Sequence, residues 1–389
     1  MAGPQADSRR DLLLELFRAA LAAVDGRRRV RAALGADRES GAVSVLAIGK
    51  AAASMTQGAL DALGTRLQRG LVVAPEGSLP LELLRHPGLR CLESAHPLPD
   101  QRSLDAGQAA LGFAAATRPG SRVLLLISGG ASALIEVPAP GVTLAQLREL
   151  YRRAQAEALD IEALNARRRA LSSIKGGKLS SLFRDCRVEG LMISDVPRDD
   201  PEVLGSGLLA APGLRTTLVG SMDDALDAVV RAASARGLTV SRAAARLQGD
   251  AEAAALHICH ELAVGAANLQ VWGGETVVRL PAEPGRGGRC QHLAVAAALA
   301  IAGHPALLLL AAGTDGRDGA SEDAGAIVDG ATLERALDCG FEPAAALAAA
   351  DTGSLLEAAG DLVHTGRTGT NVGDVVLGLR LAPGVPSAM

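Results

Sequence analysis

The sequence predicts an α/β protein made of two α/β domains with mainly parallel sheets. Short apolar runs typical of buried strands alternate along the chain with Ala- and Leu-rich helical patterns. The length of 389 residues is enough for two domains with sizeable hydrophobic cores. Several predicted strands end in glycine or small polar residues, and these are the places where open α/β sheets bind their ligands.

The first predicted element is an amphipathic helix over residues 11–23, where apolar positions recur at helical spacing. Seven strands are predicted, at Val43–Ile48, Gly70–Val73, Val123–Ile127, Gly190–Ile193, Thr216–Val219, Leu269–Trp272 and Ala306–Leu310. The predicted helices that follow or separate them include Ser103–Ala116, Leu144–Glu157, Ala225–Arg236 and Asp250–Val264. A domain boundary is expected between Gly220 and Gly273, and we place it after residue 240, which gives domains 1–240 and 241–389.

Composition and charge exclude several classes of protein. The net charge of −4 offers no bulk attraction to nucleic acid or to an acidic membrane, and aromatic residues make up only 2% of the chain. Five cysteines occur without a CxxC pair, which fits a reducing compartment better than a disulfide framework. The first residues lack the apolar core of a signal peptide, and no apolar run is long enough to span a membrane. We therefore expect a cytoplasmic protein that binds neither nucleic acid nor a membrane.

Lysine is scarce in this sequence, and each lysine lies close to glycine. Of the 39 basic residues, all but Lys50, Lys175 and Lys178 are arginine. Lys50 follows the first predicted strand directly after a glycine, whereas Lys175 and Lys178 flank a glycine pair. A flexible ammonium beside glycine backbone suits the binding of an anion. The alternative is that a bias toward arginine left three lysines at positions without special meaning.

Two further segments have the pattern of an anion site. Ser128-Gly-Gly-Ala-Ser132 follows a predicted strand and opens a helix, so its glycines and helix amides could hold an anion, with a plain turn as the alternative. A basic run from Asn165 to Arg169 leads into the glycine pair between Lys175 and Lys178. A phosphate or carboxylate partner is favoured there over a solvated helix face. Walker A and GxGxxG motifs are both missing, which disfavours a P-loop and a standard dinucleotide site.

Acidic residues follow two of the later strands. Asp195 comes just after a strand and before a proline-fixed loop, where it could bind Mg²⁺ or accept a proton, or else cap a helix. Asp315 and Asp318 lie among glycines at a spacing that suits contacts to a metal–phosphate complex. His257 and His260 sit in an apolar helical pattern with no second ligand pair, so zinc is disfavoured.

Taken in order, these segments resemble the glycerate 2-kinase family of the MOFRL type, whose older members were often labelled hydroxypyruvate reductases. The resemblance extends from about residue 11 to residue 379. Its motifs are Gly49-Lys-Ala-Ala52, His96-Pro-Leu-Pro-Asp100, Ser128-Gly-Gly-Ala-Ser-Ala-Leu134, Leu171-Ser-Ser-Ile-Lys-Gly-Gly-Lys-Leu179, Ile193-Ser-Asp-Val196, Gly273-Gly-Glu-Thr276, Gly287-Gly-Arg289, Gly313-Thr-Asp-Gly-Arg-Asp-Gly319 and Thr368-Gly-Thr-Asn-Val372. Nine motifs in the family's order make the resemblance specific.

The resemblance implies a Rossmann-like N-terminal domain, a smaller C-terminal MOFRL domain and an active site in the cleft between them. It also implies ATP-dependent phosphorylation of D-glycerate to 2-phosphoglycerate, with Mg²⁺ as a cofactor. By position, Lys50, Asp195, Arg289 and Asp315 correspond to residues proposed to line that cleft. Lys50 and Arg289 would hold the transferring oxygens or the glycerate carboxylate, Asp195 would orient or deprotonate the attacking hydroxyl, and Asp315 would help hold Mg²⁺.

A wider set of site residues follows from the motifs and the resemblance together. Substrate contacts are expected from Ser128, Gly129, Gly130, Ser132, Asn165, Arg168, Lys175 and Glu275. Nucleotide contacts are expected from Gly49, Gly176, Gly177, Gly313, Thr314, Thr370 and Asn371, and metal contacts from Asp315 and Asp318. A homodimer is left open as an assembly.

The sequence departs from the family pattern beside Arg289, where Cys290 and His292 replace an amide and a carboxylate. Arg367 replaces a proline, and Ala170 replaces a histidine. Two alternatives therefore stand beside the kinase. One is an NAD(P)H-dependent hydroxypyruvate reductase, disfavoured by the missing GxGxxG motif, and the other is a non-catalytic protein that binds a sugar acid or a nucleotide.

Overall fold

The chain forms two compact units in the computed structural model, which describes residues 8–35, 41–157 and 161–381. The first, here the parallel-sheet unit, comprises the described residues of 24–221 together with 369–372. The second, here the mixed-sheet unit, comprises residues 8–23, 222–368 and 373–381. Among the residues described, no helix is both long and apolar enough to cross a membrane.

Six parallel strands form the sheet of the parallel-sheet unit, in the order β3-β2-β1-β4-β5-β6. Their bounds are β1 Val43–Ile48, β2 Leu67–Pro75, β3 Leu89–Ser94, β4 Arg122–Ser128, β5 Arg187–Ile193 and β6 Arg215–Gly220. The strand order reverses between β1 and β4, so the topological switch point of the sheet lies between these neighbours. This is the strand order of a doubly wound, Rossmann-like sheet, and it confirms the fold class expected for this part of the chain.

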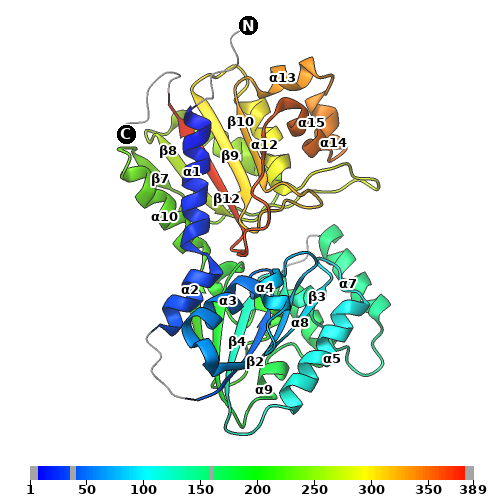
Figure 1. The fold of residues 1–389 in the computed structure, drawn as a ribbon. Helices are drawn as coiled ribbons and strands as arrows, with labels where there is room; N and C mark the ends of the chain where they lie inside the picture. The colour runs from blue at the N-terminus through cyan, green and yellow to red at the C-terminus, as the bar shows by residue number, and fades with distance from the viewer. Residues whose placement is uncertain (1–7, 36–40, 158–160, 382–389) are drawn as a thin grey trace. The chain divides into compact units, whose positions relative to one another are not determined.

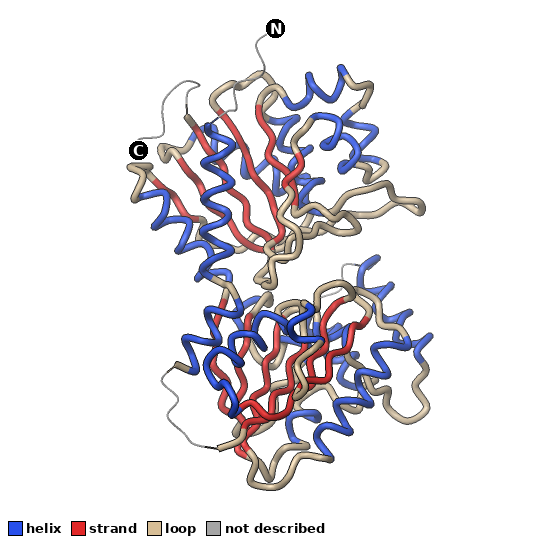
Figure 2. The backbone as a smooth tube through the Cα atoms, viewed as in Figure 1, coloured by secondary structure: helices blue, strands red, loops and turns tan. Residues whose placement is uncertain are grey.

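Helices cover both faces of the parallel sheet (Figure 2). α2 and α3 pack on one face, while α5, α6 and the segment around α9 enclose the apolar core on the other. The α-helices are α2 Gly26–Leu34, α3 Ala52–Leu63, α4 Leu81–Leu84, α5 Gln101–Ala115, α6 Ala131–Leu134, α7 Leu144–Glu157, α8 Ile161–Ala170 and α9 Lys178–Ser181. Three 3₁₀ turns, η1 Gly64–Arg66, η2 Pro197–Asp199 and η3 Leu204–Ser206, lie in the connections. The continuous apolar runs of β1, β2 and β4, whose successive side chains point to opposite faces, therefore have partners on both sides.

The sheet of the mixed-sheet unit has the order β11-β10-β9-β12-β8-β7. Its strands are β7 Val240–Arg242, β8 Leu269–Gly274, β9 Leu307–Gly313, β10 Gly325–Asp329, β11 Leu362–Val363 and β12 Asp374–Arg380. Only β7 and β8 pair in parallel, and the other four pairings are antiparallel. The expectation of mainly parallel sheets thus holds for the first sheet and not for this one. The reason is that β12 runs between β8 and β9 in the opposite direction to both.

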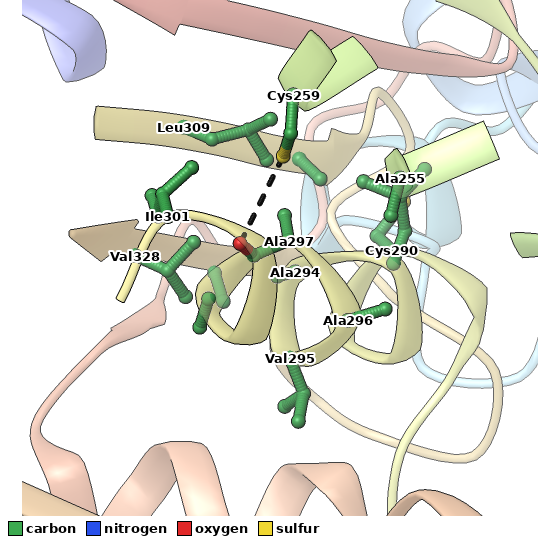
Figure 3. Packing of buried hydrophobic residues seen from close by; sticks show 14 of the residues in the cluster. Ala255, Cys259, Cys290, Ala294, Val295, Ala296, Ala297, Ile301, Leu309 and Val328 are labelled. Atoms are coloured by element: carbon green, nitrogen blue, oxygen red, sulfur yellow. Dashed lines mark hydrogen bonds between the residues drawn. The ribbon is translucent and has the colours of Figure 1, made fainter. Parts of the chain in front are cut away.

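Helices also cover both faces of the mixed sheet. α11 and α12 pack on one face, with α13 to α15 against α12, and α1 and α10 pack on the other (Figure 1). The bounds are α1 Ser8–Ala23, α10 Met222–Ser234, α11 Ala251–Val264, α12 Arg289–Ala300, α13 Thr332–Asp338, α14 Pro343–Ala348 and α15 Thr352–Ala359. Small side chains let α11 approach α12 closely, and the Cys259 thiol donates to the carbonyl oxygen of Ala297 at 3.8 Å (Figure 3). Burial raises the pKa of Cys259 to about 11, so this thiol stays protonated.

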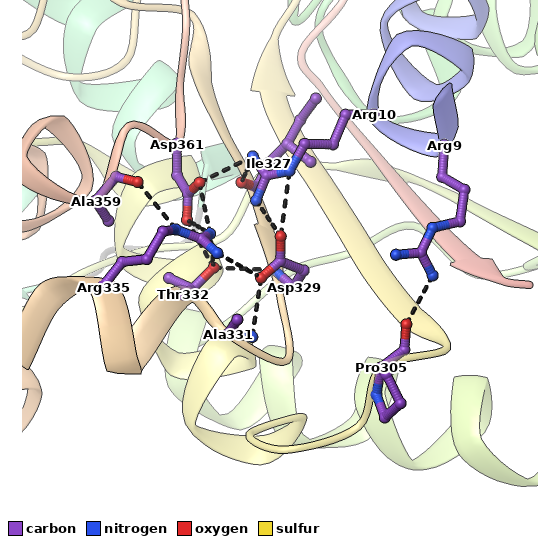
Figure 4. A network of polar contacts seen from close by, with 10 residues as sticks. All are labelled: Arg9, Arg10, Pro305, Ile327, Asp329, Ala331, Thr332, Arg335, Ala359 and Asp361. Atoms are coloured by element: carbon purple, nitrogen blue, oxygen red, sulfur yellow. Dashed lines mark hydrogen bonds and ion pairs between the residues drawn. The ribbon is translucent and has the colours of Figure 1, made fainter. Parts of the chain in front are cut away.

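A polar network fixes α1 to the mixed sheet, although this helix is the first described element of the chain (Figure 4). Arg10 forms ion pairs with Asp329, the last residue of β10, and with buried Asp361, the latter at 2.8 Å between Nη1 and Oδ1. Arg335 of α13 binds the same two carboxylates. Two arginines thus neutralise two aspartates, and the guanidinium groups hold the pKa of Asp329 at about 2 despite the opposing effect of its burial.

The structural units therefore differ from the two consecutive domains expected at 1–240 and 241–389. The mixed-sheet unit takes its first helix from the start of the chain and resumes at Met222, with α10. α10 packs on α1 and on β7 and β8, so it belongs with the second sheet. The sequence alone could not reveal that α1 belongs to the mixed-sheet unit, because the elements on which it packs lie about 200 residues or more further along the chain.

We expect Arg10→Ala to lower the free energy of unfolding by about 1–2 kcal/mol, because Asp361 is buried and loses one of its two cationic partners. Urea unfolding followed by circular dichroism measures this change. Arg18→Ala is the matched control, since Arg18 is an exposed arginine on the same helix. Equal stabilities of the two variants would show that the network contributes nothing measurable.

Candidate functional site

The switch point of the parallel sheet carries the first group of predicted site residues. Lys50 follows β1, Gly129 follows β4 and Asp195 follows β5, all at the carboxyl ends of neighbouring strands. The backbone N–H of Lys50 donates to the carbonyl oxygen of Gly129 at 2.9 Å, which ties the first two loops together. The sequence placed these residues at strand ends, and the structure brings them together.

Glycines in these loops make room for the functional side chains. A Cβ atom on Gly129 would lie 1.9 Å from Oδ2 of Asp195 and 2.4 Å from Nδ2 of Asn371. The Asn371 amide donates to this same Asp195 oxygen at 2.7 Å, so it fixes the orientation of the carboxylate. Gly130 has a φ of 80°, a conformation that favours glycine, and a Cβ there would lie 3.2 Å from Cγ of Lys50. Substitution of either glycine would therefore displace a predicted site residue.

His96 belongs to this group, although it was not among the predicted site residues. Its ring lies next to Gly130, about 3.1 Å from where a Cβ atom would be. The sequence signal for it was the His96-Pro-Leu-Pro-Asp100 motif, which the family resemblance includes without giving the histidine a role. The group at the switch point therefore contains an ammonium, a carboxylate and an imidazole.

Ser128 and Gly49 support the loop geometry. The Ser128 hydroxyl is buried and accepts the backbone N–H of Ala51 at 3.0 Å. Gly49 has a φ of 134°, and a Cβ there would lie 2.1 Å from Oγ of Ser128. The Thr370 hydroxyl likewise donates within the parallel-sheet unit, to the carbonyl oxygen of Val24 at 2.6 Å. Ser128 and Thr370 thus use these contacts to hold backbone, and their predicted ligand contacts stay predictions.

Lys175 requires a correction, because the anion that it faces is a carboxylate of the protein itself. Its side chain is completely buried and forms an ion pair with the buried carboxylate of Glu136. The Lys175 ammonium also donates to the hydroxyl of Tyr151 at 3.3 Å, and Ser172 donates to the other oxygen of Glu136 at 2.5 Å. The ammonium is therefore committed to Glu136, so the structure gives Lys175 an internal role in place of the predicted substrate contact.

The glycine pair beside Lys175 needs the same correction. The N–H groups of Gly176 and Gly177 donate to the carbonyl oxygens of Ser206 and Gly207 at 3.0 and 2.6 Å. These amides hold the turn around η3 in place of the predicted nucleotide phosphate. The ammonium of Lys178 donates to the carbonyl oxygens of Arg169 and Ser172 at 3.0 and 2.5 Å, near the carboxyl end of α8.

Asn165 and Arg168 of α8 lie together near Ser132. The hydroxyl of Ser206 donates to Oδ1 of Asn165 at 3.0 Å and is 2.7 Å from the hydroxyl of Ser132. The Arg168 guanidinium donates weakly to the same Asn165 oxygen at 3.4 Å and stacks over the ring of Tyr151 at 4.2 Å. Three of the predicted substrate contacts, Ser132, Asn165 and Arg168, are thereby brought into one cluster.

The mixed-sheet unit holds the second pair of predicted catalytic residues. Arg289 opens α12 and donates to both oxygens of buried Asp374, from Nε at 2.5 Å and from Nη2 at 3.1 Å, and also to Glu275 at 2.7 Å. Burial alone would lower the pKa of Arg289, but the two carboxylates raise it well above its usual range. Asp374 was not among the predicted site residues, and its role as the partner of Arg289 was missed. Glu275 is an arginine partner in this structure, and its predicted substrate contact stays a prediction.

Asp315 follows β9 in the same region. Its Oδ1 accepts the backbone N–H of Arg317 at 3.1 Å, and a Cβ on Gly313 would lie 3.3 Å from Asp315 Oδ1 and 3.5 Å from Asp374 Oδ1. The Thr314 hydroxyl is buried and donates to the carbonyl oxygen of Gly373 at 2.7 Å. Asp315 is therefore close to the Arg289–Asp374 pair. The predicted binding of a nucleotide by Gly313 and Thr314 stays a prediction.

Asp318 has a structural contact where a metal contact was expected. Its two oxygens accept the backbone N–H groups of Cys290 and Gln291 at 3.1 and 2.7 Å, which anchors the start of α12. Burial and the charge of Asp374 raise the pKa of Asp318 to about 7, against the opposing effect of these two hydrogen bonds. We find no group of three His, Cys, Asp or Glu residues that could hold a metal ion in the described part of the chain. The carboxylate of Asp318 is therefore committed to α12, which corrects its expected place in a metal pair.

The two departures next to Arg289 are both buried. The Cys290 thiol has a pKa raised well above its usual range by burial and by Asp374 and Asp318, so it remains neutral. The Nε2 atom of His292 lies 3.1 Å from Oε1 of Glu252 on α11. Both side chains are part of the packing of α12 (Figure 3 shows Cys290), so they affect how this helix is held.

We expect the stability conferred by Asp318 to fall as the pH rises from about 5 to 7.5. A raised pKa means that the folded state keeps a proton that the unfolded state releases, so folding is opposed increasingly until the pH passes about 7. Relative to Asp318→Asn, the wild type should lose on the order of 2 kcal/mol of unfolding free energy over this interval. Urea unfolding of both proteins at each pH tests this. A constant difference between them would contradict the raised pKa.

The fold and the clustered residues define a class: an α/β protein of two units whose Rossmann-like sheet carries lysine, histidine and aspartate at its switch point. Two family models match the chain, the domain of unknown function DUF4147 over residues 12–238 and the MOFRL family over residues 268–374. The D-glycerate 2-kinase of Thermotoga maritima is 30% identical over 96% of this chain and 99% of its own length. The chain belongs to the glycerate 2-kinase family.

Two further comparisons agree with this assignment. The crystal structure of the glycerate kinase from Thermotoga maritima matches with a TM-score of 0.83, covering 96% of this chain and 100% of that one at 29% identity. A protein of Agrobacterium vitis is 33% identical over 85% of this chain and 97% of its own length. Its name assigns it provisionally to the hydroxypyruvate reductases. The family thus includes both names that the sequence motifs led us to expect.

Proposed function

We propose that this protein phosphorylates D-glycerate at its 2-hydroxyl group, with ATP as the donor. The observation that carries the proposal is the group at the switch point, where Lys50, His96 and Asp195 surround two glycines. Ligands of doubly wound sheets bind at this position. Membership of a family that contains D-glycerate 2-kinases supports the choice of substrate.

Asp195 would orient the attacking hydroxyl and accept its proton. Its carboxylate is held by the Asn371 amide at 2.7 Å and follows a central strand, so its position is fixed before substrate arrives. Lys50 would neutralise the oxygens of the phosphoryl group during transfer. Phosphoryl transfer depends mainly on such positioning and neutralisation of charge, and little on covalent chemistry.

ATP and Mg²⁺ are implied by the family, and the polar residues present fit them in part. When bound, ATP supplies the phosphoryl group and Mg²⁺ neutralises its oxygens. Asp315 would contribute to holding the metal, because its carboxylate lies at a strand end among glycines. Arg289, whose charge is held by Asp374 and Glu275, would bind phosphate oxygens. The joint action of Lys50, Asp195, Arg289 and Asp315 on one substrate is part of this proposal.

The test is an assay with purified protein, ATP, Mg²⁺ and D-glycerate. We expect ADP to form, and the product to be converted to phosphoenolpyruvate by added enolase without phosphoglycerate mutase, because enolase acts on 2-phosphoglycerate. A product that needs the mutase would be 3-phosphoglycerate and would overturn the proposed position. No ADP, combined with oxidation of NADH in the presence of hydroxypyruvate, would favour the reductase.

A further inference from the structure

The guanidinium of Arg168 has no ion-pair partner among the residues that the structure describes. Its Nη1 atom has a weak contact to Asn165 at 3.4 Å, and its Nε atom is buried without a hydrogen-bond partner in the described chain. Arg10, Arg289 and Arg335, in contrast, each pair with two carboxylates. Burial lowers the pKa of Arg168 below its usual range, which indicates that the charge lacks compensation.

The charges around Arg168 do not balance. Glu136 is the carboxylate that interacts with it electrostatically, and this carboxylate already forms the buried ion pair with Lys175. Two cations therefore share one anion in a partly or fully buried region. A buried charge is costly unless it is paired, so the cluster is suited to receive one more negative charge.

The surroundings of Arg168 connect it to the switch point. Asn165 accepts the hydroxyl of Ser206, which in turn contacts the hydroxyl of Ser132. Ser132 belongs to the same loop and short helix as Gly130, the residue beside Lys50 and His96. The hydroxyl of Tyr151 donates to the Ser132 carbonyl at 2.7 Å, while its ring supports the Arg168 guanidinium. Arg168 is thus linked, through Asn165, Ser206 and Tyr151, to the loop whose glycines lie beside Lys50 and Asp195.

We propose that Arg168 binds the carboxylate group of the substrate and so restricts this enzyme to small hydroxy acids. The proposal rests on the proposed function for the identity of the substrate. Arginine binds carboxylates through a planar fork of donors, and stacking on Tyr151 holds the plane of that fork. The rest of the cluster is neutral or already paired, which matches a carboxylate with one negative charge. A nucleotide phosphate carries more charge and would need further unpaired cations.

The experiment compares Arg168→Gln and Arg168→Lys with the wild type, with Arg167→Gln as the control. Arg167 lies on the same helix but is exposed. We expect Arg168→Gln to raise the KM for D-glycerate by about 10- to 100-fold, the loss typical of one charge-assisted pair, with the KM for ATP changed less than about twofold. The KM of Arg168→Lys for D-glycerate should lie between those of the wild type and Arg168→Gln, because an ammonium keeps the charge but lacks the planar fork of donors. Arg167→Gln should behave as wild type.

Calorimetry without ATP separates this inference from the proposed function. It compares the binding of D-glycerate with that of glycerol, which lacks the carboxylate. If the wild type binds D-glycerate through Arg168 but forms no ADP, the proposed function fails and the inference stands. If ADP forms and Arg168→Gln keeps the wild-type KM for D-glycerate, the inference is overturned and the function stands. A raised KM for ATP alone would also overturn it, since the anion would then be a nucleotide phosphate. Should Arg168→Gln not fold, an unchanged KM for D-glycerate in Arg168→Lys overturns the inference equally.

Discussion

Replacement of Lys50 by arginine should lower kcat by about 100-fold, although the positive charge is kept. The side chain of Lys50 runs past Gly130, where even a Cβ atom would lie 3.2 Å from its Cγ. The flexible stem and compact ammonium of lysine fit this passage and can follow a phosphoryl group as it moves. A guanidinium is longer, planar and rigid, so it would displace His96 or point away from the transferring oxygens.

The measurement is steady-state turnover of D-glycerate and ATP by purified Lys50→Arg, with circular dichroism to establish that it is folded. Lys178→Arg is a matched control, because it makes the same exchange beside the glycine pair, at a lysine that binds backbone carbonyl oxygens near the end of α8. It should retain most of the wild-type rate. A Lys50→Arg enzyme with a near-normal kcat would remove the lysine ammonium from the mechanism.

The strand-end rule predicted correctly which residues of the parallel-sheet unit lie together at one edge of the sheet. Lys50, Gly129 and Asp195 were identified because each follows an apolar strand, and parallel strands bring their carboxyl ends to one edge of the sheet. The rule has no equivalent for loops that follow helices. The neighbouring glycines predict an anion ligand at Lys175, yet its partner Glu136 is 39 residues earlier in the chain. Partners at that distance are visible only in the fold.

The same limitation applies to the mixed-sheet unit. Arg289 is predicted from its motif, whereas its partner Asp374 lies 85 residues later and belongs to none of the nine motifs. Asp318 was grouped with Asp315 on spacing, but the fold turns its carboxylate toward the amides of α12. Spacing indicates which residues are neighbours in the loop, and it does not show toward which element each side chain points.

The prediction of strands also succeeded where the apolar pattern was clear and failed where it was not. All seven predicted strands exist, and most of them are buried runs of apolar residues in either sheet. Five strands were missed, namely β3, β7, β10, β11 and β12. β3 is an edge strand with polar and partly exposed residues. β12 escaped prediction although it is almost entirely buried, since a short apolar run after a loop can equally begin a helix. This last strand is the one that makes the second sheet mixed, so missing it also concealed the antiparallel pairings.

Lys175→Met should lower the free energy of unfolding by about 3–5 kcal/mol, because it leaves the Glu136 carboxylate buried without its cation. Glu136→Gln should also destabilise the protein, since it leaves the buried ammonium unpaired. The glutamine carbonyl oxygen in Glu136→Gln can still accept the Ser172 hydroxyl or the backbone N–H of Val137, both of which donate to the same oxygen of Glu136 in the wild type. The double variant Lys175→Met/Glu136→Gln removes both charges and keeps those hydrogen bonds.

The double variant should therefore be more stable than the Lys175→Met single variant, and urea unfolding of all four proteins forms a double-mutant cycle that measures the coupling. Its kinetics add a second test of the same cluster. With positions 175 and 136 both neutral, the single charge of Arg168 remains, so the KM for D-glycerate should change far less than in Arg168→Gln. Lys175→Met with wild-type stability, or additive effects in the cycle, would contradict a buried ion pair and make Lys175 a candidate anion ligand again.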